Sequence, residues 1–348
     1  MKIFLAYILK RSFMLTMAVL FFFLLLDSVF SIISELEDVT EAYTFIEILK
    51  YILSSAPSRS IEFIEGACLL GFMLSLMFAQ KEGNLNVLRS SGISPLKITT
   101  INALAPLLLS VIFLFLNEMY FLDLKNNAYI DKSNLKSNQA TTNEVIWYED
   151  NNNFLSFEEK VNDILFNTTI INVDEIGLNY ILKVNQLSIN EKNEVFISDS
   201  SRINYIYGSN LDTNFSIKLP SLIKISYKDI QNLTLVKLVE YKNLERITAN
   251  KKDDLFFSHI SKNLYEKIFM PFSILALCIF FGSFVYGSLR NSTSSYIIVT
   301  SVAGAFVYNL IQDFTMSYSI SYNLVQIYGV LLPGFIIFIA GIVRLNKT

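Results

Sequence analysis

The sequence predicts a polytopic α-helical membrane protein with six transmembrane helices and an inserted all-β, jellyroll-like domain. The chain has 348 residues, of which 52% are hydrophobic. The apolar residues gather into stretches near the length that crosses roughly 30 Å of hydrocarbon. A polar segment, rich in Asn, Asp, Lys and Ser, separates the third stretch from the fourth and contains short alternating runs typical of strands.

The expected membrane spans are 13–33, 63–79, 98–121, 268–289, 295–312 and 324–343. Residues 268–289 and 324–343 contain no charged side chain, whereas the second span begins near Glu62 and Glu65. The N-terminus carries basic residues before its apolar run, and no small-residue cleavage site follows. We therefore expect an uncleaved anchor helix, the alternative being a cleaved signal peptide.

The basic residues of the short loops predict the orientation in a membrane. With the N-terminus inside, all of them fall on the cytoplasmic side: Lys2, Lys10, Arg11, Lys81, Arg89, Lys97, Arg290, Arg344 and Lys347. The expected first outer loop, 34–60, is mainly acidic. The predicted divisions are 1–121 with three helices, 122–262 as a periplasmic β domain, and 263–348 with three helices. Both termini are expected in the cytoplasm.

The polar segment contains eight candidate strands separated by turn signals such as EDNNN and NEKNE. The strand-like runs are VIWYED, NFLSFEE, DILFNTTIINV, YILKVNQLSI, EVFISDSS, RINYIYG, FSIKLP and LIKISY. This pattern predicts a sandwich or jellyroll. Residues 250–265 are expected to return to the membrane as an amphipathic helix.

Motifs for catalysis are absent from the sequence. It has one histidine, His259, and no P-loop, C-x-x-C or H-E-x-x-H pattern. We therefore expect a non-enzymatic subunit with no metal and no cofactor. The net charge of −3, without a basic cluster, argues against a nucleic-acid partner. Because few carboxylates fall within the spans, coupling to an ion gradient is weakly supported.

Asp27 is the exception, because it lies within the first span, about 9 Å from its outer end. A carboxylate at that depth should face the bundle interior or water. Two interpretations stay open. Asp27 lines a polar wall of a substrate cavity, or it makes a structural hydrogen bond to a neighbouring helix, for instance to Asn309 or Gln312.

Residues 85–98, LNVLRSSGISPLKI, leave the membrane for about a dozen residues and then return. Gly92 suits a left-handed residue ending a short helix from about Lys81 to Ser91. Ser94 can cap the next helix, with Pro95 at its first position. These signals predict a rigid helix–turn–helix at the cytoplasmic face.

The short helix carries Leu85 and Leu88 on one face, with Arg89 beside them. Exposed leucines on a cytoplasmic helix favour docking into a groove of a partner protein. The alternative is a tight loop whose leucines pack on the membrane surface.

The stretch MFAQKEGNLNVLRSSGISPLKI resembles the coupling segment of the lipopolysaccharide-export permeases, the paired F and G subunits of the Lpt ABC transporter. DSVFSIISELEDV, GACLLGFMLSLMFAQ, VIWYEDNNNFLSF and VYGSLRNSTSSYIIVTSVAGAFVYNLIQDF also resemble the family, over nearly the whole chain. The first and last of these are closer to the G subunit. Where the family often reads Ser-Glu-Leu, this chain has Gly83-Asn84-Leu85, with the acid at Glu82.

The resemblance implies a heterodimer with an F-type permease, over two copies of a B-type cytoplasmic ATPase, in the bacterial inner membrane. Lipopolysaccharide would enter between helices 1 and 5 and pass to a bridge of C- and A-type jellyroll proteins. The coupling helix, 81–95, would bind the ATPase through Glu82, Leu85, Leu88, Arg89 and Gly92. The lipid cavity and gate would comprise Phe21, Phe22, Leu25, Asp27, Phe306 and Leu310. Some G subunits carry basic residues at the outer part of helix 1, where this sequence has Ser31 and Ser34. Lipid phosphates would then need Lys50, Arg59, Lys262 or Lys267, or the partner subunit; otherwise the substrate is less phosphorylated.

Two other functions are compatible with the sequence. One is an ABC-type exporter subunit for another envelope lipid or lipoprotein. The other is a membrane-anchored sensor or scaffold whose β domain binds a ligand. A scaffold has no need of a docking helix between the second and third spans.

Overall fold

The computed structural model describes residues 2–40, 42–135, 146–150, 153–157, 159–161, 164–174, 177–189, 194–196, 203–207, 217–218, 230–248, 254–287, 294–322 and 324–347. Arg290 and the run expected as a strand at 222–227 lie outside these residues. The chain divides into two compact units. One contains Met1–Val39, Phe45–Lys125 and Ser261–Thr348, and the other contains Thr40–Thr44 and Asn126–Ile260.

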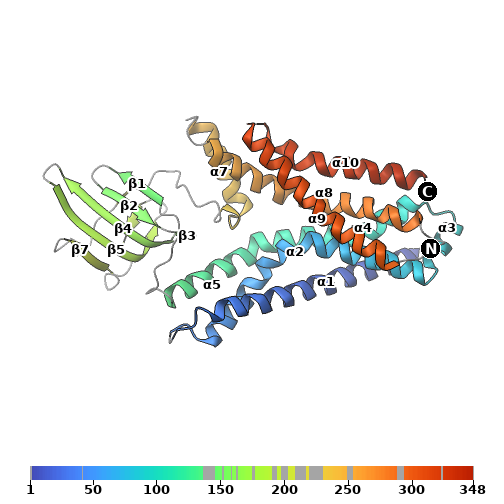
Figure 1. Cartoon of the computed structure of the whole chain (residues 1–348), viewed down its shortest axis with the longest axis horizontal. Helices are drawn as coiled ribbons and strands as arrows, with labels where there is room; N and C mark the ends of the chain where they lie inside the picture. Colours follow the sequence, from blue (N-terminus) through green and yellow to red (C-terminus); the bar gives the residue numbers. More distant parts are fainter. Residues whose placement is uncertain are drawn as a thin grey trace. The chain divides into compact units, whose positions relative to one another are not determined.

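The first unit is built from long apolar helices (Figure 1). They are α1 (Lys2–Leu36), α2 (Phe45–Lys81), α4 (Pro95–Leu116), the part of α8 (Asp254–Gly287) from Ser261 on, α9 (Ser294–Ser321) and α10 (Gln326–Lys347), with the short α3 (Asn84–Ser90) between α2 and α4. A π-helix, η1 (Asn117–Phe121), joins α4 to α5 (Leu122–Leu135). Within the described residues, six helical segments are long and apolar enough to cross a membrane, which confirms the six predicted helices.

The second helix is longer than its sequence pattern indicated, because α2 begins at Phe45 within the expected outer loop 34–60. The physical reason for the longer helix is that buried residues recur at helical spacing in a stretch whose acidic residues suggested a loop. Ile48, Ile52 and Ser55 recur at intervals of four and three, and all three are buried. The expectation of a long outer loop was therefore wrong for its second half.

The core of the helical unit depends on close helix approaches as well as on apolar side chains. A Cβ atom added at Gly71 of α2 would lie 2.3 Å from the Cα atom of Thr16 in α1. Small residues at helix contacts allow backbones to approach closely, which is how helices pack in the absence of a water-driven hydrophobic effect. The tight contact fixes α1 against α2.

The second unit contains the antiparallel sheet. Its described strands are β1 (Ile146–Asp150), β2 (Asn153–Phe157), β3 (Glu159–Val161), β4 (Ile164–Asp174), β5 (Gly177–Ile189), β6 (Glu194–Phe196), β7 (Ile203–Tyr207) and β8 (Ile217–Lys218). They form one sheet in the order β1-β2-β4-β5-β6-β8, with β3 paired to β4 and β7 paired to β5. The predicted insertion of a β domain is confirmed.

The register of β4 and β5 places buried residues opposite one another. Ile170 pairs with Leu182, and Thr168 pairs with Val184, and all four are buried. Side chains of alternating residues share a face of a sheet, so this face forms the core of the unit. The unit also contains helix α7 (Leu235–Thr248), whose Tyr241 ring packs edge-on against Phe256, at 6.0 Å between centroids.

Candidate functional site

The segment between α2 and α4 is shaped by two glycines. Gly83 and Gly92 have φ angles of 74° and 84°, a left-handed conformation that residues with a Cβ atom rarely adopt. They bracket α3 and set its direction. Ser94 caps α4 by accepting a hydrogen bond from the Lys97 amide, and Pro95 follows at the first helical position. The left-handed Gly92 and the Ser94 cap were both predicted and are confirmed.

The leucines of α3 do not point outward. Leu85 is fully buried and Leu88 is 3% exposed, and both belong to the same apolar core cluster as Ile93 and Ile98. The prediction of exposed leucines that insert into a partner was therefore wrong. Their three-residue spacing does place them on one face of the helix, but that face packs against the chain's own transmembrane core.

The outward face of α3 consists of Asn86, Val87 and Ser90, which are exposed, with Arg89 half-buried beside them. Val87 is 62% exposed. Sequence reasoning missed Val87, although its position between the two leucines was the available signal. A short helix that is anchored by leucines and presents one apolar residue among polar ones offers a small, rigid surface for a partner.

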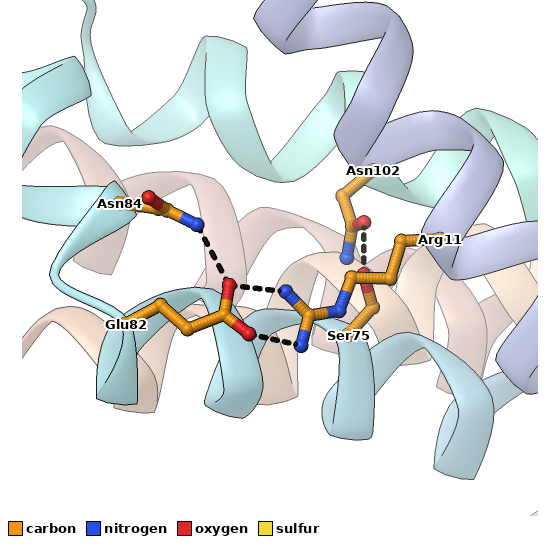
Figure 2. Close-up of polar contacts among 5 residues, drawn as sticks. All are labelled: Arg11, Ser75, Glu82, Asn84 and Asn102. Carbon is orange, nitrogen blue, oxygen red and sulfur yellow. Dashed lines mark hydrogen bonds and ion pairs between the residues drawn. The ribbon is translucent and has the colours of Figure 1, made fainter.

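Glu82 forms an ion pair with Arg11 and a hydrogen bond with Asn84 (Figure 2). The Arg11 guanidinium in α1 donates two hydrogen bonds to its carboxylate, 2.6 Å from Nη1 to Oε2 and 2.7 Å from Nη2 to Oε1. The Asn84 side-chain amide, at the start of α3, donates to the same Oε2 at 2.8 Å. These bonds hold the pKa of Glu82 below its ordinary value of 4.5, chiefly through the hydrogen bonds from Arg11.

Arg11 is itself held in place by its surroundings. Its side chain is 17% exposed, and the guanidinium carbon lies 5.1 Å from the ring centroid of Phe78 in α2 and 5.9 Å from that of Tyr7. Cation–π contacts at these distances favour a fixed orientation. No local pattern indicated Arg11, because 71 residues separate it from Glu82.

A buried network of hydrogen bonds joins α1, α2 and α4 close to this ion pair. Asn102 of α4 accepts hydrogen bonds from Ser75 Oγ at its side-chain oxygen (2.9 Å) and from Ser12 Oγ at its backbone carbonyl (3.1 Å). Its amide nitrogen donates to the Phe72 carbonyl at 3.3 Å. Figure 2 shows the Ser75–Asn102 bond beside Arg11 and Glu82. Satisfied polar groups of this kind define a single arrangement of the three helices.

The residues predicted for the lipid cavity and gate lie on α1 and α9, and their apolar members are exposed. Phe21, Phe22 and Leu25 extend along α1, and Phe306 and Leu310 extend along α9. The exposed fractions of these side chains range from 50% to 65%. Such a density of exposed apolar residues marks a face that is covered by lipid or by another protein.

Asp27 has a partner that the sequence did not indicate. Its Oδ2 atom lies 3.0 Å from Nε of Arg59 in α2, and both side chains are largely buried. Arg59 also donates to Ser31 Oγ at 2.8 Å. The partner of Asp27 on a neighbouring helix is thus Arg59 of α2, where Asn309 or Gln312 had been given as examples, and Asn309 is exposed. The pair forms because α1 and α2 pack side by side at this depth.

The other cations considered for lipid phosphates also face carboxylates. Lys262 lies 3.4 Å from Asp313 and 3.6 Å from Glu266. The remaining two pairs are Lys267 with Glu118, at 3.9 Å, and Lys50 with Glu47, at 3.8 Å. All four candidate cations, including Arg59, thus have an acidic neighbour that offsets their charge.

Six membrane-capable helices, an anchored short helix between the second and third, and an inserted antiparallel sheet describe a polytopic helical membrane protein with an inserted β domain. The family model described as lipopolysaccharide export system permease LptF/LptG matches residues 6–347. The chain belongs to this family, whose members are generally non-catalytic permease subunits that function with other Lpt components. No curated protein matched the chain.

Proposed function

We propose that this chain is a G-type permease subunit of an ATP-driven transporter that extracts lipopolysaccharide from the bacterial inner membrane. It pairs with an F-type permease, and a separate B-type ATPase hydrolyses ATP beneath the pair. The β domain passes the lipid to periplasmic jellyroll proteins of the C and A types. Family membership supports an export permease, and the resemblance of DSVFSIISELEDV and VYGSLRNSTSSYIIVTSVAGAFVYNLIQDF to the G subunit supports the G-type assignment.

The observation that carries the proposal is α3, anchored at the end of the helical unit. A helix of seven residues is too short to be stable on its own. Here Leu85 and Leu88 hold it against the core, while Asn86, Val87 and Ser90 remain exposed. In this reading Glu82 and Gly92 set the position of the helix, Arg89 lies at its rim, and Val87 takes the docking role first given to the leucines.

The orientation follows from the distribution of charge. Both termini and α3 lie at one end of the helical unit (Figure 1). Basic residues concentrate at this end: Lys10, Arg11, Lys81, Arg89, Lys97, Arg344 and Lys347. Because positive charge in short loops favours the cytoplasmic side, we place this end in the cytoplasm and the β domain in the periplasm.

The exposed faces of α1 and α9 supply the apolar wall that acyl chains require. Phe21, Phe22, Leu25, Phe306 and Leu310 can bind lipid tails without any charge, by burying apolar area. In the assembled transporter, α1 of one subunit and α9 of the other would form the lateral gate. Asp27 and Arg59 would lie on the polar part of that wall as a neutralised pair.

A second cargo is favoured by one observation. The four cations that could meet lipid phosphates each face a carboxylate, so this subunit offers the phosphates little unbalanced positive charge. This arrangement favours an envelope lipid with fewer phosphates. The architecture and the ATPase partner would be the same for either cargo.

The first experiment is affinity purification of the tagged protein in mild detergent, with mass spectrometry of the bound proteins and lipids. We expect a second six-helix permease, a nucleotide-binding subunit and lipid A species. A different bound lipid would support the second cargo. Purification of the chain without an ATPase would overturn the proposal and favour a sensor or scaffold.

A variant of the docking face sharpens this experiment. Val87→Asp places a charge on the exposed face of α3 and should abolish ATPase recovery without loss of expression. Val236→Asp is the matched control, since Val236 is similarly exposed, at 67%, but lies in α7 of the other unit. Equal ATPase recovery with both variants would refute docking through this face.

A further inference from the structure

The carboxylate of Glu82 joins two helices that are distant in sequence. On one side it accepts both hydrogen bonds from Arg11 of α1, and on the other it accepts the amide of Asn84, the first residue of α3. Glu82 itself continues the last turn of α2, because its backbone amide donates to the Phe78 carbonyl at 3.0 Å. The start of α3 is therefore tied to α1 through one shared carboxylate (Figure 2).

The α1 side of this link is rigid. Arg11 is enclosed by the rings of Phe78 and Tyr7. The next residue, Ser12, bonds to the Asn102 carbonyl in α4. A force on the guanidinium is therefore carried by the α1 backbone, since the side chain has little freedom to reorient.

The α3 side is bounded by two left-handed glycine turns. Gly83 and Gly92 flank the helix, and an added Cβ atom at either would meet nothing within 4 Å. A displacement of this seven-residue helix between its two glycine turns would move it as a unit about its buried leucines. Glu82 and Asn84 then determine which neighbouring helix moves with the N-terminal end of α3.

We propose that Arg11 is a positioning residue that couples displacement of α3 to α1 through Glu82 and Asn84. This inference rests on the proposed function, in which the ATPase moves α3. Because α1 also carries Phe21, Phe22 and Leu25 on its exposed face, the link gives the ATPase a direct route to the lipid-facing helix. In this proposal Glu82 acts through the internal link.

The first test measures the link without the ATPase. Hydrogen exchange of the α3 amides is followed in the purified full-length chain and in Arg11→Gln, Glu82→Gln and Asn84→Ala. Each variant should raise exchange about two- to fivefold, the effect of losing a half-exposed, charge-assisted bond. Lys10→Gln removes a neighbouring exposed charge and is the matched control, with no change expected. Unchanged exchange in Arg11→Gln would overturn the proposal.

The second test measures coupling in the reconstituted transporter, as lipid released per ATP hydrolysed. Arg11→Gln and Glu82→Gln should lower this ratio about threefold, in proportion to the loss of one ion pair, while the ATPase still co-purifies. Arg11→Lys keeps the positive charge but lacks the planar guanidinium that donates two hydrogen bonds at once. Its ratio should therefore lie between those of Arg11→Gln and the wild type. The exchanged pair Arg11→Glu with Glu82→Arg should restore more.

The outcomes separate the two proposals. If wild-type protein recovers no ATPase, the proposed function fails, and the exchange measurement still decides whether Arg11 holds α3. If the ATPase binds and the ratio is unchanged in both single variants, the coupling role of Arg11 is refuted and the proposed function stands.

Discussion

Gly71→Ala is the most direct test of the close contact between α1 and α2. The added Cβ atom would lie 2.3 Å from Cα, 2.5 Å from Oγ1 and 2.6 Å from the backbone nitrogen of Thr16. Ordinary contact begins at 3.4 Å, so the helices must separate by 3.4 − 2.3 = 1.1 Å at this point. Backbone atoms cannot step aside as a flexible side chain can.

The cost of this separation can be estimated. Overpacking costs about 3 kcal/mol where backbone must move, and loss of the nearby Ser12–Asn102 hydrogen bond adds about 1 kcal/mol. Replacing glycine by alanine within a helix returns about 1 kcal/mol. The free energy of unfolding should therefore fall by about 3 kcal/mol, or about 150-fold in the unfolding constant.

The assay is unfolding by sodium dodecyl sulfate in mixed micelles, compared with Gly66→Ala. The matched control lies in the same helix, but its nearest neighbour is Phe23 Cε2 at 3.8 Å. It should be as stable as the wild type or slightly more stable. Equal midpoints for the two variants would refute the conclusion that α1 and α2 touch at Gly71.

Three further predictions follow from buried and paired groups. Asp27→Asn should lower stability by about 2 kcal/mol, because it leaves Arg59 charged and largely buried, and Asp27→Asn with Arg59→Gln should recover part of the loss in the same assay. Leu88→Asp should prevent folding, seen as loss of the monodisperse chromatographic peak, whereas Val87→Asp should not. The folded-state pKa of Glu82 is depressed, so the stability that its ionised carboxylate contributes is present above pH 4.5 and is lost as pH falls through the folded pKa. Hydrogen exchange of the α3 amides, corrected for intrinsic rates, should therefore rise at acid pH in the wild type but stay flat in Glu82→Gln.

The sequence could predict features that depend on neighbouring residues. The positive φ of Gly92 and the cap at Ser94 belong to this class, because a turn and a helix start are specified by a few consecutive residues. The apolar residues of α3 show the limit. Their spacing gave the correct shared face for Leu85 and Leu88, but periodicity states which residues lie together and not what they face.

The sequence by itself determined the six helices, the inserted β domain and the helix–turn–helix between the second and third spans. These are consequences of hydropathy over a membrane thickness, of period-two alternation and of local turn chemistry. Tertiary structure alone decided that Arg11 meets Glu82 and that Asp27 meets Arg59. Arg11 in α1 meets Glu82, which directly follows α2, across 71 residues of sequence. Asp27 in α1 meets Arg59 within α2 across 32 residues. Such contacts depend on how closely and in which rotation two helices pack, and here that packing is set by the backbone approach at Gly71.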